Sequence, residues 1–399
     1  MHIIQLILNI LEIVSFIYLA MAAVYILVFG FASLFPHREK QIKGTHERRI
    51  AVLIPGYKED SVIIDVAKDA LNQSYPSDLY DVVIIADSFE KATLDDLKKL
   101  PVKLVEVSFD ISTKSKALNK AMQTIGDNYD VALVLDADNL MKQDFVERIN
   151  FAFDNGYTVV QGHRVAKNQN TSFAILDAIS EEVNNAIFRK GHRVLGFSSA
   201  LIGSGMAFDY TFFKETMSNV KAVGGFDKEL ELKLLRDRVK IEYLSNAIVL
   251  DEKVQKAEVF ANQRRRWLSA QFVYFRRFFF SGLYHLFFKG NFDFFDKVIQ
   301  MIQPPRVILL GVVTIFTLFV YLLEIVGFTL LYFPGIQWLT ILIITYLAFL
   351  MSIPRSFYNR KTFMAVLTLP KAFFIMILSL LKLKGANKKF IHTTHGTDK

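Results

Sequence analysis

Three long apolar runs constrain the fold of this chain most, because each can cross a lipid bilayer as a helix. The first, Ile13 to Phe35, contains no charged residue. At about 1.5 Å per residue it spans a hydrocarbon core of roughly 30 Å. The other two are Val307 to Phe333, interrupted only by Glu324, and the uncharged Ile336 to Ile353, which Pro334-Gly335 separates. We therefore expect an N-terminal transmembrane helix in residues 1–36 and a transmembrane hairpin in residues 306–354.

The basic residues beside these runs predict the orientation of the chain. Arg38 and Lys40 follow the first run, Arg306 precedes the hairpin, and Arg355 and Arg360 follow it, whereas the hairpin turn carries no charge. Basic flanks face the cytoplasm in membrane proteins. We expect a multi-pass protein of the cell membrane whose large middle part, residues 37–270, is cytoplasmic.

Two features near the C-terminus have alternative interpretations. The fourth apolar run, Phe363 to Leu381, contains Pro370 and Lys371 and precedes a lysine-rich tail. We expect it to form an interfacial or re-entrant helix, so that residues 355–399 end in a basic cytoplasmic tail. Glu324 can be a functional intramembrane carboxylate, but we expect it to lie near the far interface or against a neighbouring helix.

Composition excludes several classes of function. The chain has no cysteine, which rules out disulfides, thiol catalysis and cysteine-bound metal centres. Its net charge of +8 could suggest nucleic acid, but the basic residues gather beside apolar runs and fit membrane flanks better. The expected partners are the lipid bilayer and, as an open possibility, other membrane subunits, with no nucleic acid.

Between the apolar runs, short β-rich segments alternate with helical ones, which predicts βαβ units and a mostly parallel, doubly wound sheet. The expected strands are Ile50 to Ile54, Asp81 to Ile85, Val102 to Val107, Val131 to Leu135, Tyr157 to Gln161 and Ile241 to Tyr243. The expected helices are Asp60 to Asn72, Ser115 to Thr124 and Lys142 to Phe153. The aromatic segment that follows, residues 271–305, is expected to form interfacial helices.

The strand Val131 to Leu135 runs directly into Asp136 and Asp138. Ligands of α/β sheets bind outside the carboxyl ends of the strands, and two carboxylates on a turn there can hold a hard divalent cation. Such a cation can neutralise a leaving nucleoside diphosphate. An ordinary Asp-rich turn gives the same pattern, so the motif needs support from elsewhere.

Polar residues follow other strands at the same predicted edge of the sheet. Pro55, Tyr57 and Glu59 end the first strand, and Asp87 ends the second. Lys114 opens a helix, where phosphate oxygens are favoured. The chain lacks both the G-x-G-x-x-G and the G-x-x-x-x-G-K-[ST] patterns, which argues against a dinucleotide enzyme or a P-loop ATPase.

A last cluster, Gln263-Arg264-Arg265-Arg266-Trp267, precedes the aromatic segment. Together with Asp136-Ala137-Asp138 it resembles the paired D-x-D and Q-x-x-R-W motifs of the membrane-embedded, processive-type members of glycosyltransferase family 2. That group includes cellulose, chitin and hyaluronan synthases and ceramide glucosyltransferases. The resemblance covers about residues 49 to 275 and implies a GT-A-type, Rossmann-like nucleotide-sugar-binding α/β domain with flanking transmembrane helices.

The resemblance implies a role for each matching residue. Pro55, Tyr57 and Glu59 belong to the first motif, in which Lys58 replaces the usual Asn, and Asp87 contacts uridine. Lys114 and Asn119 lie near the donor, Asp136 contacts the donor, and Asp138 contacts Mg²⁺ or Mn²⁺. In the last motif, Gln263 is a substrate-binding residue, Arg266 holds the diphosphate and Trp267 stacks on the acceptor sugar.

The family's catalytic T-E-D is altered here to Asp227-Lys228-Glu229. The following Leu230-Glu231-Leu232 keeps the family's register, so the resemblance implies that Glu229 is the general base, with Asp227 and Glu231 in reserve. The implied activity is the inverting transfer of a sugar from a nucleotide-diphosphate sugar to a lipid-linked or growing polysaccharide acceptor in surface glycan biosynthesis. The expected donor is a UDP-sugar. A processive synthase with its own translocation path and a non-catalytic scaffold are the alternatives.

Overall fold

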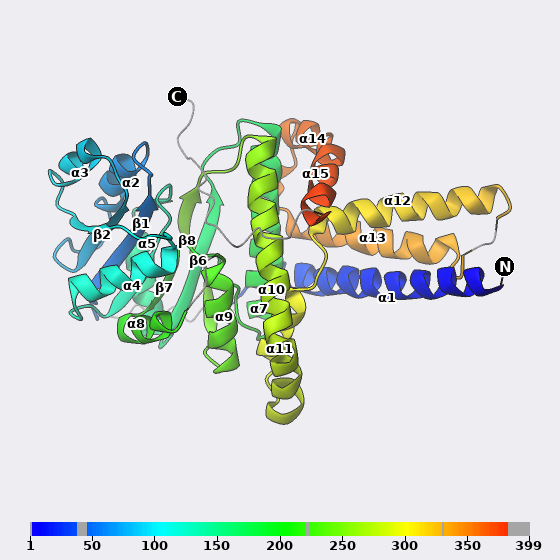
Figure 1. Ribbon diagram of the computed structural model, residues 1–399, viewed down its shortest axis with the longest axis horizontal. Coiled ribbons are helices and arrows are strands. Elements are labelled where there is room, and N and C mark those ends of the chain that lie inside the picture. Colours follow the sequence, from blue (N-terminus) through cyan, green and yellow to red (C-terminus); the bar gives the residue numbers. More distant parts are fainter. Residues whose placement is uncertain (1, 38–45, 221–223, 329–330, 382–399) are drawn as a thin grey trace.

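The computed structural model describes residues 2–37, 46–220, 224–328 and 331–381. The basic flank at 38–45 and the lysine-rich tail from 382 onward lie outside the described residues. Figure 1 shows a sheet domain at one end, long projecting helices at the other, and a layer of helices between them.

The sheet has eight strands in the order β3-β2-β1-β4-β7-β6-β8-β5. Their bounds are β1 Ile50–Tyr57, β2 Tyr80–Asp87, β3 Lys103–Val107, β4 Val131–Val134, β5 Leu140–Met141, β6 Val159–Ala166, β7 Met206–Asp209 and β8 Ile241–Asp251. The α/β class is confirmed, but the sheet is mixed rather than mostly parallel. Strand β7 is antiparallel to both β4 and β6, and β5 is antiparallel to β8.

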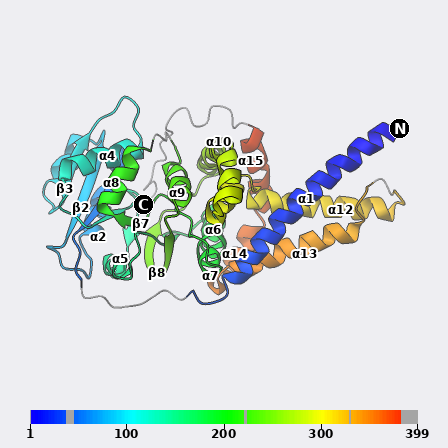
Figure 2. The same ribbon diagram turned by 90° about the horizontal axis from the view of Figure 1, so that it is seen from below.

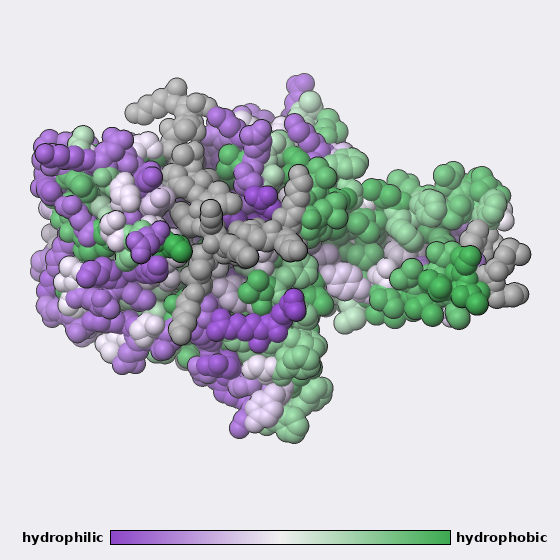
Figure 3. Space-filling model, viewed as in Figure 1, coloured by the Kyte–Doolittle hydropathy of each residue, from purple (hydrophilic) through white to green (hydrophobic). Residues whose placement is uncertain are grey.

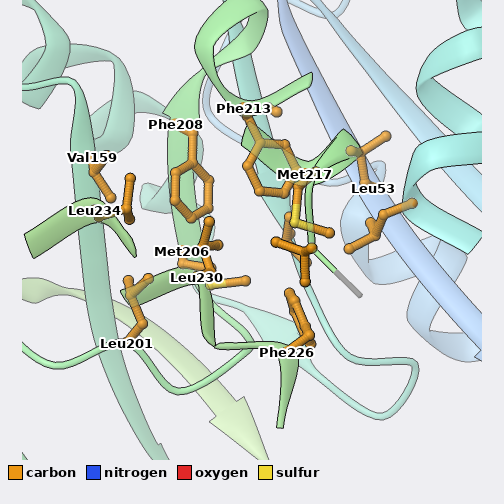
Figure 4. Packing of buried hydrophobic residues seen from close by; sticks show 14 of the residues in the cluster. Leu53, Val159, Leu201, Met206, Phe208, Phe213, Met217, Phe226, Leu230 and Leu234 are labelled. Carbon is orange, nitrogen blue, oxygen red and sulfur yellow. The ribbon is translucent and has the colours of Figure 1, made fainter. Parts of the chain in front are cut away.

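Two hydrophobic clusters cover the two faces of the sheet, because successive side chains of a strand point to opposite faces. On β1, Ile50 and Val52 join one cluster, and Ala51 and Leu53 join the other. The helices that contribute to the first cluster are α2 (Ile63–Ala70), α3 (Lys91–Leu97) and α5 (Phe145–Asp154). Those of the second include α4 (Lys114–Ile125), α8 (Tyr210–Ser218) and α9 (Phe226–Arg236), together with α10 (Ala257–Lys289) and α11 (Phe292–Gln300), and Figure 4 shows its centre.

Among the described residues, three single helices are long and apolar enough to cross a membrane: α1 (His2–Ala32), α12 (Arg306–Ile325) and α13 (Gly335–Ser352). A bent pair of helices in residues 360–381 passes the same test only when its two members are taken together. Helices α1, α12 and α13 project together on the side away from the sheet domain and carry a hydrophobic surface, whereas the visible face of the sheet domain is mainly hydrophilic (Figures 1 and 3). Helix α1 begins before the expected run, so Glu12 lies within it. The apolar composition of these helices indicates association with a membrane.

Both carboxylates of these helices accept backbone hydrogen bonds at the turn between α12 and α13. Buried Glu12 accepts from the N–H groups of Tyr332 and Phe333 at 2.7 and 3.1 Å. Glu324 accepts from the N–H of Gly335 at 2.7 Å. Glu324 therefore lies against a neighbouring helix, one of the two positions expected for it. Its carboxylate satisfies an N–H group at the start of α13, and such groups lack partners within their own helix.

A single helix, α10 (Ala257–Lys289), runs through the predicted boundary between residues 270 and 271 without interruption. It runs across the direction of α1, α12 and α13 (Figure 1), and α11 (Phe292–Gln300) packs against it. The fourth apolar run forms α14 (Arg360–Val366) and α15 (Leu369–Leu381), which are bent by 44°. Helix α6 (Ser172–Asn184) lies between the sheet domain and the projecting helices (Figure 2), and a π-helix (Asn185–Gly191) and α7 (His192–Val194) continue it.

Candidate active site

A cavity of about 680 Å³ lies between the carboxyl ends of β1, β2 and β4 and the helices α6, α10 and α12. Ten of the twelve residues proposed from the sequence line it. They are Pro55, Tyr57, Glu59, Asp87, Lys114, Asp136, Asp138, Gln263, Arg266 and Trp267. The sequence motifs therefore converge in space, although the role of each residue stays a prediction.

Three carboxylates form the acidic centre of the cavity. Asp136, Asp138 and Asp251 each place an oxygen within 4.8 Å of the others. Oxygen ligands of this kind suit Mg²⁺ or Mn²⁺, so the donor set fits a divalent cation. Sequence reasoning missed Asp251, which ends β8. Its signal was the apolar run Ile248 to Leu250 that leads into an aspartate, the same pattern as at Asp136.

Hydrogen bonds from neighbouring loops hold this triad in place. The N–H of Asp136 donates to Ser204 Oγ at 2.9 Å, and Asp138 accepts from the N–H of Glu252 at 3.1 Å. The amide of Asn139 donates to Asp251 at 3.1 Å. The carboxylates are therefore positioned by the protein itself.

Lys114, the first residue of α4, links the triad to the opposite wall of the cavity. Its Nζ lies 2.5 Å from Asp136 Oδ1 and 2.6 Å from the carbonyl oxygen of Gly203. Gly203 has a φ of +81°, a conformation that L side chains rarely adopt. The turn at Gly203 thus brings a backbone carbonyl to the lysine.

A buried network of charges extends from the triad to α6. Arg164 lies 3.6 Å from Asp251 and 2.8 Å from Glu181, and Lys253 lies 2.7 Å from Asp251. Burial alone would raise the pKa of Asp251, but Arg164 and Lys253 together hold that pKa below its usual value. Strand β6 extends through Arg164, beyond the expected end of that strand at Gln161.

The structure contradicts the predicted position of Glu229. This side chain is 1% exposed, lies outside the cavity lining, and pairs with Lys233 at 2.7 Å and Arg277 at 3.3 Å. Glu231 is also turned away and pairs with Lys297 at 2.6 Å. Burial raises the pKa of Glu231. Of the three candidate bases, the one that lines the cavity is Asp227.

The rotation of α9 about its axis explains this difference. Phe226 and Leu230, one helical turn apart, are both buried in the core beneath the sheet, as Figure 4 shows. With that face fixed, Asp227 packs near Gly203, where an added side-chain carbon would lie 3.7 Å from the Asp227 Cβ. Residue 229 is two positions further and points elsewhere.

Asn119 is the second predicted residue outside the cavity lining. It lies on α4, and its side-chain amide donates to the carbonyl oxygen of Met217 at 3.1 Å. Met217 belongs to the last turn of α8, where carbonyl groups lack partners within the helix. The described structure therefore gives Asn119 a contact between helices rather than one in the cavity.

On α10, a neighbour of the predicted residues anchors the Q-x-x-R-W motif. Arg264 pairs with Asp177 of α6, and its guanidinium lies 4.4 Å from the centre of the Trp267 ring. Trp267 remains 37% exposed, so part of its ring is open to a ligand. Burial lowers the pKa of Arg266. Sequence reasoning gave Arg264 no role, although it stands within the motif.

Comparison with known proteins identifies the family. Residues 47–270 match the model of the family described as "Glycosyltransferase like family 2". The chain is a family 2 glycosyltransferase. The fold of its sheet domain is accordingly of the GT-A type, and the family expected from the motifs is confirmed. The processive subgroup stays a prediction.

Two curated relatives illustrate the similarity of this glycosyltransferase to known enzymes. The probable glycosyltransferase YdaM of Bacillus subtilis (strain 168) is 26% identical over 279 residues, 61% of this chain and 64% of YdaM. The beta-monoglucosyldiacylglycerol synthase of Nostoc sp. (strain PCC 7120 / SAG 25.82 / UTEX 2576) is 26% identical over 246 residues, 58% of this chain and 50% of that synthase. Each match spans less than two-thirds of the relative's own length.

Solved structures of similar fold include the mannosyltransferase PcManGT from Pyrobaculum calidifontis in complex with GDP-Man and Mn²⁺. It is 15% identical, with a TM-score of 0.46, and the alignment covers 84% of this chain and 98% of that one. Glucosyl-3-phosphoglycerate synthase from Mycobacterium tuberculosis, in complex with Mn²⁺, UDP and glucosyl-3-phosphoglycerate, is 16% identical with a TM-score of 0.39. That alignment covers 57% of this chain and 82% of the other. The likeness concerns the fold alone.

Proposed function

We propose that this glycosyltransferase transfers a sugar, with inversion, from a UDP-sugar to a lipid-linked acceptor at the cytoplasmic face of the cell membrane. One observation carries the proposal: a single cavity reaches from the acidic triad to apolar side chains of the membrane-side helices. These side chains are Ile26, Leu309, Leu310, Phe349, Ile353 and Met376. A nucleotide-sugar fits the polar end, and the hydrocarbon part of an acceptor fits the apolar end.

The lipid acceptor has further support from the relatives. The beta-monoglucosyldiacylglycerol synthases, 26% identical to this chain, are named for a glycolipid product. The basic flanks of the apolar runs support a cytoplasmic sheet domain. A surface glycan or glycolipid is the proposed product. The processive alternative needs a polar path for a polymer, whereas the membrane side of this cavity has the apolar side chains named above.

At the donor end, the proposed roles follow from charge and position. Asp136, Asp138 and Asp251 would hold Mg²⁺ or Mn²⁺, which when bound neutralises charge on a leaving diphosphate. Lys114 and Arg266 line the same cavity and supply further positive charge for phosphate oxygens. Asp87, at the end of β2, lines the same cavity, and we assign to it the contact with the nucleoside.

We assign the general base to Asp227 because its carboxylate lines the cavity. In the transfer, the acceptor hydroxyl oxygen forms a bond to the anomeric carbon while the bond from that carbon to the diphosphate breaks. The electron pair leaves with UDP, and the hydroxyl proton passes to Asp227. Attack from the face opposite the leaving group inverts the anomeric configuration.

The proposal is tested with purified protein in lipid nanodiscs. A panel of UDP-sugars is supplied with Mg²⁺ or Mn²⁺ and candidate lipid acceptors, and both UDP release and glycolipid formation are measured. We expect UDP release that depends on an added lipid and a glycolipid of matching mass. Release of UDP without any glycosylated lipid, or a soluble polymer as the product, would overturn the lipid acceptor.

A further inference from the structure

At the membrane end of the cavity, one arginine has no ion pair with any carboxylate of the described residues. Arg306, the first residue of α12, lines the cavity and donates to Asn184 Oδ1 and, at 3.0 Å, to Ser180 Oγ. Both partners are neutral side chains of α6. Among the residues that the structure describes, no carboxylate oxygen lies within 4.0 Å of its guanidinium.

The other cations near α6 do have acidic partners. Arg164 and Arg189 pair with Glu181, Lys253 pairs with Asp251, and Arg264 pairs with Asp177. Arg164 also lies 4.0 Å from Asp136, so with Arg306 included, five cationic side chains share four carboxylates in this described part of the cavity wall. A surplus of buried positive charge is costly unless an anion compensates it.

The surplus positive charge lies where the lining of the cavity changes from polar to apolar side chains. Leu309 and Leu310 follow Arg306 on α12, and Met376 of α15 lines the same region. On the other side of Arg306, α6 presents Ser180 and Glu181 towards the charged network. Arg306 therefore stands between the polar and the apolar part, where the head group of a lipid meets its hydrocarbon chains.

We propose that the acceptor is a lipid whose head group carries a phosphate, and that Arg306 binds this phosphate. The inference rests on the proposed function and narrows its acceptor class to anionic lipids. A guanidinium suits phosphate because its N–H donors match two phosphate oxygens at once. The proposed acceptor differs from the lipid in the name of the Nostoc synthase, because diacylglycerol carries no charge.

Two sources can supply such a phosphate. In a phospholipid with a free head-group hydroxyl, the hydroxyl attacks the anomeric carbon, its proton passes to Asp227, and UDP leaves with the electron pair. In a polyprenyl phosphate, a phosphate oxyanion attacks the anomeric carbon instead. An oxygen–carbon bond forms, the bond from that carbon to the diphosphate breaks, and UDP leaves with the electron pair. No proton has to be removed. Activity of Asp227→Asn separates these sources, because only the hydroxyl acceptor needs the base.

The test compares Arg306→Gln and Arg306→Lys with Arg355→Gln, an exposed arginine just beyond the end of α13 that does not line the cavity. Nanodiscs contain phosphatidylglycerol, polyprenyl phosphate or diacylglycerol as the acceptor. Rates of glycolipid formation give kcat and KM for each lipid, and titration gives the affinity for UDP. Elution of each variant as a single species and unchanged UDP affinity show that it is folded.

We expect wild-type protein to prefer one of the two phosphate lipids over diacylglycerol. Arg306→Gln should raise the KM for that lipid at least about tenfold and leave the UDP affinity unchanged. Arg306→Lys should keep part of the preference for the phosphate lipid. Arg355→Gln should behave as wild type. Preferred transfer to diacylglycerol, or an unchanged KM in Arg306→Gln, overturns the inference and leaves the proposed function standing. Absence of transfer to every lipid overturns both.

Discussion

Glu229 and Lys233 form an ion pair of 2.7 Å across one turn of α9, and the glutamate is 1% exposed. Arg277 of α10 adds a second cation at 3.3 Å. Glu229 therefore connects α9 to α10 in the described structure. Within the segment Asp227-Lys228-Glu229, the carboxylate that lines the cavity is that of Asp227 and not that of Glu229.

The first prediction concerns this exchange of roles. With a hydroxyl acceptor, Asp227→Asn should lower kcat by about 10²- to 10⁴-fold, the usual cost of losing a general base. Glu229→Gln should keep transfer within a few-fold but lower the thermal midpoint, because it weakens the pairs with Lys233 and Arg277. Steady-state kinetics and a thermal scan of both variants decide the matter. A dead Glu229→Gln beside an active Asp227→Asn would restore the assignment made from the sequence.

The second prediction concerns the acidic triad. Asp138→Asn and Asp251→Asn should each strongly weaken Mn²⁺ binding and transfer, because the neutral amide oxygen of Asn replaces a charged carboxylate ligand of a hard cation. Mn²⁺ titration followed by electron paramagnetic resonance measures binding independently of activity. Asp144→Asn, an aspartate outside the cavity lining that pairs with Arg148, is the control. Normal Mn²⁺ affinity in Asp251→Asn would show that β8 does not contribute a ligand.

The third prediction concerns stability at low pH. Buried Glu242 of β8 lies 2.7 Å from Arg193 and 2.8 Å from His37. Burial opposes its charge, but these partners lower the pKa of Glu242 from 4.5 to about 2. A depressed pKa contributes stability above pH 4.5 that is lost as the pH falls towards 2, by about 3 kcal/mol. Glu242→Gln should lower the thermal midpoint at pH 7 and flatten its decline between pH 5 and 3. An equally steep decline in the variant would assign the acid sensitivity to other groups.

The fourth prediction concerns topology and uses the absence of native cysteines. In intact cells, a cysteine at exposed Tyr332, in the turn between α12 and α13, should react with an impermeant maleimide. A cysteine at Ser88, beside the cavity, should react only after the cells are permeabilised. These results follow from basic flanks on the cytoplasmic side. The reverse pattern would place the sheet domain outside.

The sequence predicted those parts of the site that follow strands with clear apolar patterns. Val131 to Leu135 leads into Asp136 and Asp138, and these residues do line the cavity. Strand β8 was expected to end at Tyr243, because the polar Ser245 and Asn246 interrupt its apolar run, and Asp251 was missed with it. In the structure, β8 continues past an irregularity in its pairing with β6, near Gly162 and His163.

The rotation of α9 could not be predicted from motif register. The alignment of the motif matches Glu229 to the family's catalytic carboxylate by its position along the chain. The burial of Phe226 and Leu230 determines instead which carboxylate of α9 faces the cavity. In the same way, the partners of Arg306 lie on α6, more than a hundred residues away in the sequence. Contacts of this kind depend on how separate elements pack, and no local pattern records them.

The continuity of α10 sets a distance as well as a shape. Thirty-three residues of unbroken helix are about 50 Å long, with Arg266 and Trp267 in the first half and the exposed Phe280 and Phe287 in the second. Helix α10 runs across the direction of α1, α12 and α13 (Figure 1), so its two halves lie at nearly the same position along that direction. If the acceptor is the proposed lipid, we expect the enzyme to glycosylate a group close to the bilayer surface and not one carried far from that surface on a long glycan.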